Sequence, residues 1–95
     1  MNPFDELEKS YPDVIAQMPK RFNTHEFILV LAHQNQSLYI KALAQCVDNQ
    51  YPFQTAHGML AKILAKFDDL IYYIGDEPST NIFGQSSDAS VWGKK

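Results

Sequence analysis

Cysteine is almost absent from this chain of 95 residues, in which Cys46 is the single example. One cysteine excludes an intramolecular disulfide framework and is typical of a protein in a reducing compartment. Long apolar runs are absent too, because the longest, Phe27–Ala32, is far shorter than the roughly 20 residues that a membrane span needs. The N-terminus is acidic and has no apolar signal segment. We therefore expect a cytoplasmic protein with no membrane partner.

The sequence signatures of catalysis, cofactor binding and metal binding are also missing. There is no Gly-x-Ser-x-Gly elbow, no phosphate-binding glycine loop and no Cys-x-x-Cys pair. His25 and His33 lack the i, i+4 spacing of a zinc-binding His-Glu-x-x-His helix. We therefore predict no catalytic residues, no metal ligands, no cofactor and no small-molecule ligand, and we expect a protein that is not an enzyme.

The chain has a net charge of −3. It therefore lacks the surplus of basic residues that strong nonspecific nucleic-acid binders normally have. The charge is uneven along the chain. The first 20 residues and the residues after position 66 are acidic, whereas residues 21–66 are mildly basic. The basic part coincides with the region in which we expect the main helices. The charge pattern therefore leaves DNA open as a partner without requiring it.

The N-terminal segment has the chemistry of a short helical region. Asn2 can cap a helix, and Pro3 suits the first helical position because its missing N–H would have no partner there. Pro12 interrupts the helical pattern in the middle of the segment. Residues 3–18 therefore predict one kinked helix or two short ones.

The best local signal in the chain is a helix start at Asn23. With Asn23 as N-cap, Glu26 falls at the position that completes a capping box, and Phe22 and Phe27 fall at the positions of a hydrophobic staple. A polar stretch at residues 33–37 interrupts the apolar stripe of this helical region. We favour two helices with a short turn over one long helix.

The next helix is expected over residues 54–67, and two interpretations remain for the segment after it. Residues 70–74 have β-branched and aromatic side chains typical of a strand, and residues 89–92 form a second short apolar segment that can pair with them. The apolar positions also continue the helical period, so a single helix over residues 54–74 is the alternative. In the polar loop between the two segments, Ile82 and Phe83 are expected to pack against the body of the protein.

From Thr24 to Lys95 the expected order is helix, helix, helix, strand, loop, strand. This order resembles winged helix-turn-helix domains of the bacterial transcription-regulator type, most closely in the passage Leu64–Gly75. The resemblance implies a mainly α fold with a small β-hairpin, in which a three-helix core carries an N-terminal helical appendage. We assign residues 1–20 to the appendage and residues 21–95 to the winged-helix-like domain. The alternative is an all-α domain of three or four helices.

The resemblance implies that the helix over residues 54–67 reads double-stranded DNA, which would make the protein a dimeric transcriptional regulator. Polar groups at the start of this helix suit base edges, its lysines suit phosphates, and its small residues permit close approach. The candidate DNA-binding residues are Gln54, Thr55, His57, Gly58, Lys62 and Lys66. The acidic loop of the hairpin argues against DNA, because its carboxylates would repel phosphates.

The alternative function is a protein-protein interaction or dimerisation module on the same scaffold, without DNA binding. Large apolar side chains outside the expected helical core would contact another protein or a second copy of the chain. The candidate interaction residues are Phe4, Leu7, Tyr11, Ile82, Phe83 and Trp92.

Overall fold

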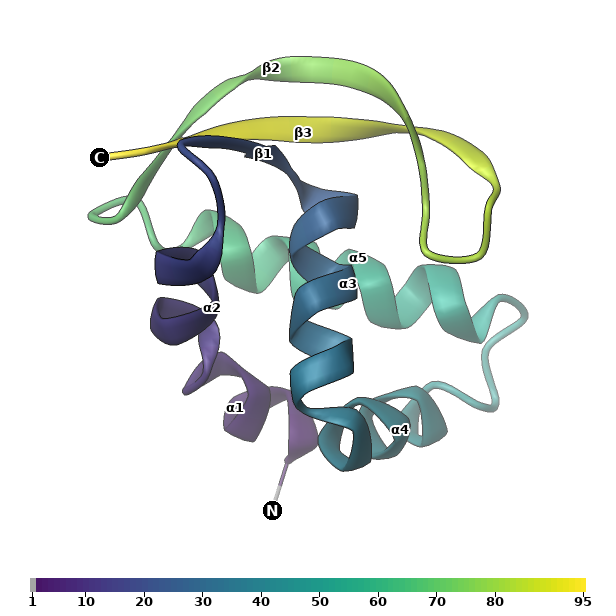
Figure 1. Ribbon diagram of the computed structural model, residues 1–95. Coiled ribbons are helices and arrows are strands. Elements are labelled where there is room, and N and C mark those ends of the chain that lie inside the picture. The colour runs from purple at the N-terminus through teal and green to yellow at the C-terminus, as the bar shows by residue number, and fades with distance from the viewer. Residues whose placement is uncertain (1) are drawn as a thin grey trace.

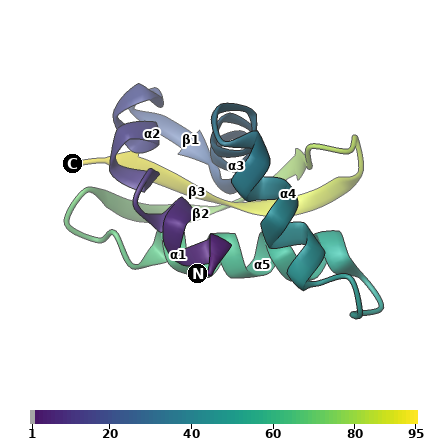
Figure 2. The ribbon, with the colours of Figure 1, turned by 90° about the horizontal axis from the view of Figure 1, so that it is seen from below.

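A computed structural model describes residues 2–95 of the chain. The elements in chain order are α1 (Pro3–Glu8), α2 (Tyr11–Gln17), β1 (Arg21–Asn23), α3 (Thr24–Gln34), α4 (Gln36–Gln45), α5 (Pro52–Ala65), β2 (Ile71–Thr80) and β3 (Ser86–Lys94). The strands form one sheet that arches over the helices, with α5 running roughly alongside the β2–β3 hairpin (Figures 1 and 2). None of the described helices is long and apolar enough to cross a membrane.

The N-terminal segment forms two short helices, and both belong to the core. The side chain of Asn2 accepts a hydrogen bond from the Phe4 amide at 3.0 Å, so α1 begins as its capping residue predicts. Phe4 and Leu7 are almost fully buried, and such burial stabilises a fold by roughly 2 kcal/mol for each side chain. Both helices therefore contribute side chains to the hydrophobic core, and the division of the chain at residue 20 stays a prediction. The amphipathic pattern of this short segment did not reveal how deeply it packs.

Tyr11 shows how α2 is tied to the rest of the core. Its hydroxyl donates a hydrogen bond of 2.7 Å to the backbone carbonyl of Leu60 in α5. Its ring packs against Phe27 and Phe67, with centroids 4.8 and 5.4 Å away. Burial, with a smaller contribution from the charge of Glu8, raises the pKa of Tyr11 far above its ordinary value. The phenol therefore stays protonated and keeps donating to α5.

The helix start at Asn23 is confirmed, and the same residue also ends a strand. The Asn23 side chain accepts from the Glu26 amide at 2.9 Å, and the Glu26 carboxylate accepts from the Asn23 amide at 2.8 Å. The φ of −109° and ψ of 168° at Asn23 are extended, as an N-cap requires. This conformation also lets Arg21–Asn23 pair with β3. The strand was not predicted, because three residues before a helix carry no strand signal of their own.

Two helices with a short turn are confirmed between Thr24 and Gln45, because α3 ends at Gln34 and α4 begins at Gln36. The helix predicted over residues 54–67 is also confirmed as α5, which begins and ends two residues earlier. Pro52 is its first residue, where a missing N–H costs nothing. The alternative of one helix over residues 54–74 is wrong, because the chain turns after Ala65 and is extended from Ile71.

The predicted fold class, mainly α with a small hairpin, is also wrong. The structure is α/β, with 51% of its residues in helices and 23% in a three-stranded antiparallel sheet of order β1-β3-β2. The predicted pairing of residues 70–74 with 89–92 is confirmed by Tyr73 opposite Trp92, but the strands extend to Thr80 and Ser86. In the sequence this part was predicted as a polar loop, and it contains Pro78. An edge strand tolerates proline because one side of its backbone needs no partner in the sheet.

A candidate binding cleft

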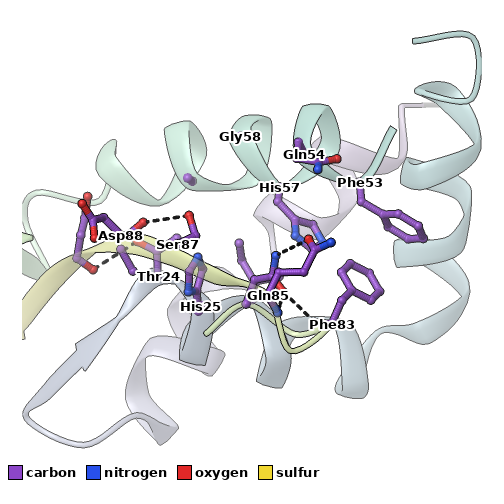
Figure 3. Close-up of a pocket in the computed structure, with 15 residues that line it drawn as sticks. Thr24, His25, Phe53, Gln54, His57, Gly58, Phe83, Gln85, Ser87 and Asp88 are labelled. Atoms are coloured by element: carbon purple, nitrogen blue, oxygen red, sulfur yellow. Dashed lines mark hydrogen bonds between the residues drawn. The ribbon is translucent and has the colours of Figure 1, made fainter. Parts of the chain in front are cut away.

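The hairpin bends toward the N-terminal half of α5 (Figure 1). A cleft of about 560 Å³ lies between the two (Figure 3). Gln54, His57 and Gly58 of α5 form one wall. The start of α3, the β2–β3 loop and the first residues of β3 supply the rest of the lining. Segments separated by about 30 and 60 positions in the sequence therefore meet at one site.

An aromatic cluster closes one end of the cleft. Phe83, at the tip of the hairpin, packs on Phe53 of α5 with a centroid distance of 4.2 Å. The Phe83 ring also lies parallel to the imidazole of His57, at 5.7 Å and with an interplanar angle of 3°. Phe53 and Phe83 are nevertheless 45% and 46% exposed, so almost half of each residue faces solvent. These contacts hold the hairpin tip on α5 and leave an exposed apolar surface at this end of the cleft.

The hairpin tip is built to present Phe83. The Asn81 side chain accepts hydrogen bonds from the backbone amides of Phe83 and Gln85 at 2.9 and 3.0 Å. Gly84 has a φ of +82°, a conformation that residues with a Cβ rarely adopt. The turn is therefore fixed by local hydrogen bonds, and its position does not depend on Phe83 alone.

Two histidines line the cleft, and each has a distinct environment. The Nε2 of His57 lies 2.6 Å from the hydroxyl of Tyr39 in α4. Burial, and then the nearby charge of His25, lower the pKa of His57 below 6.5, so this imidazole is neutral near pH 7. The Nδ1 of His25 is a buried polar atom with no hydrogen-bond partner among the described residues. Such an atom costs about 1–3 kcal/mol when it stays unsatisfied.

The charge of the lining is negative. Asp88, on β3, is an exposed carboxylate, and no Lys or Arg side chain lines the cleft in the described part of the chain. The other polar lining groups are hydroxyls and amides, including those of Thr24, Gln54 and Gln85. These groups can bind neutral or cationic polar molecules, whereas a phosphate would meet no positive partner.

The structure divides the predicted DNA-binding residues into two groups. Gln54, His57 and Gly58 lie inside the cleft. Thr55, Lys62 and Lys66 lie on other parts of α5 and its C-terminal cap, and both lysines are exposed. The cleft therefore contains three of the six candidates, and the two lysines lie outside it.

The predicted interaction residues are also divided. Phe4, Leu7 and Tyr11 are buried in the core. Ile82 and Trp92 are partly buried and pack against the core, and the Trp92 indole donates to the Thr24 hydroxyl at 3.0 Å. Phe83 is the member of the set that is both exposed and part of the cleft. The expectation that Ile82 and Phe83 pack against the body is confirmed.

Several cleft residues were not identified from the sequence, among them Thr24, His25, Phe53, Gln85, Ser87 and Asp88. The one sequence pattern that indicates this region is the pair of large apolar residues, Ile82 and Phe83, in a polar loop. Within residues 2–95, no three His, Cys, Asp or Glu side chains cluster in a way that could hold a metal ion. The Ser87 hydroxyl donates to the backbone carbonyl of Asp88 rather than to an imidazole.

No family model matches the sequence, and neither the curated proteins nor the solved structures contain a match.

Proposed function

We propose that this protein is a non-enzymatic binding module that recognises a segment of another protein in the cleft between α5 and the β2–β3 hairpin. The observation that carries the proposal is the composition of the cleft. It combines hydrogen-bonding side chains with two half-exposed phenylalanines and contains no Lys or Arg side chain among the described residues. Amides and hydroxyls suit a peptide backbone, and exposed aromatic rings suit an apolar side chain.

The contacts of the polar side chains support binding rather than catalysis. A nucleophilic hydroxyl needs a neighbouring base within hydrogen-bond distance. His57 Nε2 is instead bonded to a phenol, and the Thr24 hydroxyl lies 3.4 Å from the backbone carbonyl of Ser90.

Gly58 offers a direct test. A Cβ at this position meets nothing within 4 Å, so Gly58→Leu adds an apolar side chain to the wall of the cleft at a position where the Cβ has free space. It also removes a helix-interior glycine, which favours α5 by up to about 1 kcal/mol. Ala65→Leu is the matched control, because Ala65 is exposed on the same helix and does not line the cleft.

The experiment selects peptides from a random display library on the immobilised protein and measures the affinity of the selected sequences by calorimetry. We expect them to bind the wild type and A65L alike and to lose most of their affinity for G58L. If no peptide is enriched, or if the selected peptides bind G58L as well as they bind the wild type, the proposed function is wrong.

DNA reading by α5 is the second candidate function. It is favoured by the exposure of Lys62 on α5 and of Lys66 at the C-terminal cap of that helix. Two observations weigh against it. Gln54 and His57, which would be nearest the bases, face a cleft that also contains Asp88. Lys94, a basic residue of the hairpin that could contact phosphates, instead donates hydrogen bonds to the backbone carbonyls of Ala16 and Met18.

A mobility-shift experiment on mixed-sequence duplex DNA at low salt tests this second candidate. If α5 reads DNA, the shift should weaken steeply with salt and disappear in the double variant K62E/K66E. The absence of any shift for the wild type at low salt excludes it.

A further inference from the structure

The two ends of the cleft differ in chemistry. Phe53 and Phe83 lie together at one end, whereas Asp88 lies at the other end beside Ser87 and the start of α3 (Figure 3). His57 and Gln85 lie between the two ends, near the aromatic pair. An occupant that uses the whole cleft therefore needs an apolar group at one end and a different group at the other.

The negative charge of Asp88 determines which chemical group of an occupant fits the second end of the cleft. Of the neighbouring acidic residues on the hairpin, Glu77 is bonded to Arg21 at 3.4 Å and to Asn23 at 3.0 Å, and Asp76 accepts from the Tyr73 hydroxyl at 2.9 Å. No side-chain hydrogen bond or ion pair to the Asp88 carboxylate is formed within the described residues. Asp88 is exposed and is one of the residues that line the cleft, so it is available to a cation.

The length of the cleft limits the spacing of the two groups. Along α5 the lining runs from Phe53 to Ala61, which is roughly 12 Å at about 1.5 Å per helical residue. An extended peptide covers this distance with about four residues. The aromatic end also suits the aliphatic or aromatic side chain of such a peptide, since Phe53 and Phe83 bury only about half of their surface against each other and the protein.

From these observations we infer that the cleft binds an extended segment of a partner protein that carries a Lys or Arg side chain about three residues from an apolar or aromatic one. The basic side chain pairs with Asp88, and the apolar one packs on Phe53 and Phe83. This inference rests on the proposed binding function and adds the charge and the spacing of the partner segment.

The test uses three synthetic peptides and the full chain labelled with ¹⁵N for NMR titration. The peptides are acetyl-Phe-Gly-Gly-Arg-amide, the same peptide with Glu in place of Arg, and the same peptide with Gln. We expect the Arg peptide to shift amide resonances of residues 53–61 and 85–90, with an affinity about fivefold higher than that of the Gln peptide. The Glu peptide is expected to bind most weakly.

Two variants assign the preference to Asp88. In D88N the advantage of the Arg peptide over the Gln peptide is expected to disappear. D69N is the matched control, since Asp69 is an exposed acid that does not line the cleft, and it is expected to leave the preference unchanged.

The outcomes separate the inference from the proposed function. If the three peptides bind at the cleft with equal affinity, or if D88N keeps the preference, the inference is wrong although the binding function stands. If library-selected peptides bind the cleft but carry no basic residue, the inference is wrong in the same way. If neither the three peptides nor any library peptide binds, both are wrong, and duplex DNA that shifts the cleft resonances would overturn both in favour of nucleic acid.

Discussion

The hydroxyl of Tyr39 lies 2.6 Å from Nε2 of His57 and joins the middle of α4 to the first half of α5. Burial raises the pKa of Tyr39 to about 12, so the phenol is protonated near neutral pH and can donate to the imidazole. The same imidazole stacks on Phe83 at the hairpin tip. This hydrogen bond therefore positions His57, a residue of the cleft whose ring also packs against Phe83 at the hairpin tip.

Replacing Tyr39 with Phe should destabilise the fold by about 1 kcal/mol, because His57 loses its partner while remaining half-buried. Urea unfolding monitored by circular dichroism measures the change. Y51F is the control, since the Tyr51 hydroxyl is exposed and meets only the side chain of Gln50; it should be neutral. Equal stability of Y39F and the wild type would show that the bond contributes nothing.

Stability should fall as the pH is lowered from about 7.5 to about 5.5. The pKa of His57 is lower in the folded state than its ordinary 6.5, so the unfolded chain binds more protons in this range. Stability from the neutral imidazole is therefore fully present above the unfolded value and is lost as the pH falls through the folded one. The titratable groups that face His57 are His25 on α3 and Tyr39 on α4.

Urea unfolding at both pH values checks this dependence. H57Q should show a weaker loss of stability on acidification than the wild type. H33Q should behave as the wild type does, because His33 is exposed in the last turn of α3. A wild-type pH dependence in H57Q would assign the effect to other groups.

Gly93 should tolerate alanine only when Tyr72 is absent. The two residues are opposite each other in β2 and β3, and a Cβ on Gly93 would overlap the Tyr72 ring. G93A should therefore push the ring into solvent and cost about 1 kcal/mol. In a Y72A background the same change should be neutral or stabilising, because alanine is favoured over glycine in a strand. A double-mutant cycle of unfolding free energies measures the coupling, and strict additivity would contradict it.

The N-terminal helices should be essential for folding. Y11A removes a buried ring and its bond to the Leu60 carbonyl and should cost about 3–5 kcal/mol. The fragment 21–95 should lack a cooperative thermal transition, because it lacks the side chains of α1 and α2 that complete the core. Y51A, at an exposed position, is the control. A fragment that melts cooperatively near the wild-type temperature would instead support the assignment of residues 1–20 to an appendage.

Elements specified by local chemistry could be predicted from the sequence. Asn23 and Glu26 lie within one helical turn and cap it wherever the rest of the chain goes. The helix α5 has an apolar stripe of its own, and the start of β2 has strand-type residues. The fold class was missed because β1 is a strand only through its pairing with residues 91–93, and because the edge position of β2 permits Pro78.

The cleft could not be predicted, because it depends on how the hairpin bends. The register shifts between Tyr73 and Gly75, and such a bulge bends a strand and increases its twist. Phe83 then reaches Phe53, which is 30 positions away. The helix α5 was predicted from the sequence. Nothing in the residues of α5 indicates that the hairpin packs over its N-terminal half.

The pairing of β1 has a consequence for the order of events during synthesis. β1 forms its hydrogen bonds with β3 and not with β2, so Arg21–Asn23 has no strand partner until residues 91–93 have been made. The helices can form and begin to pack while the ribosome is still translating. The sheet, and with it the cleft, is then completed only after β3 has left the ribosomal tunnel, and this long-range closure is the step expected to limit the rate of folding.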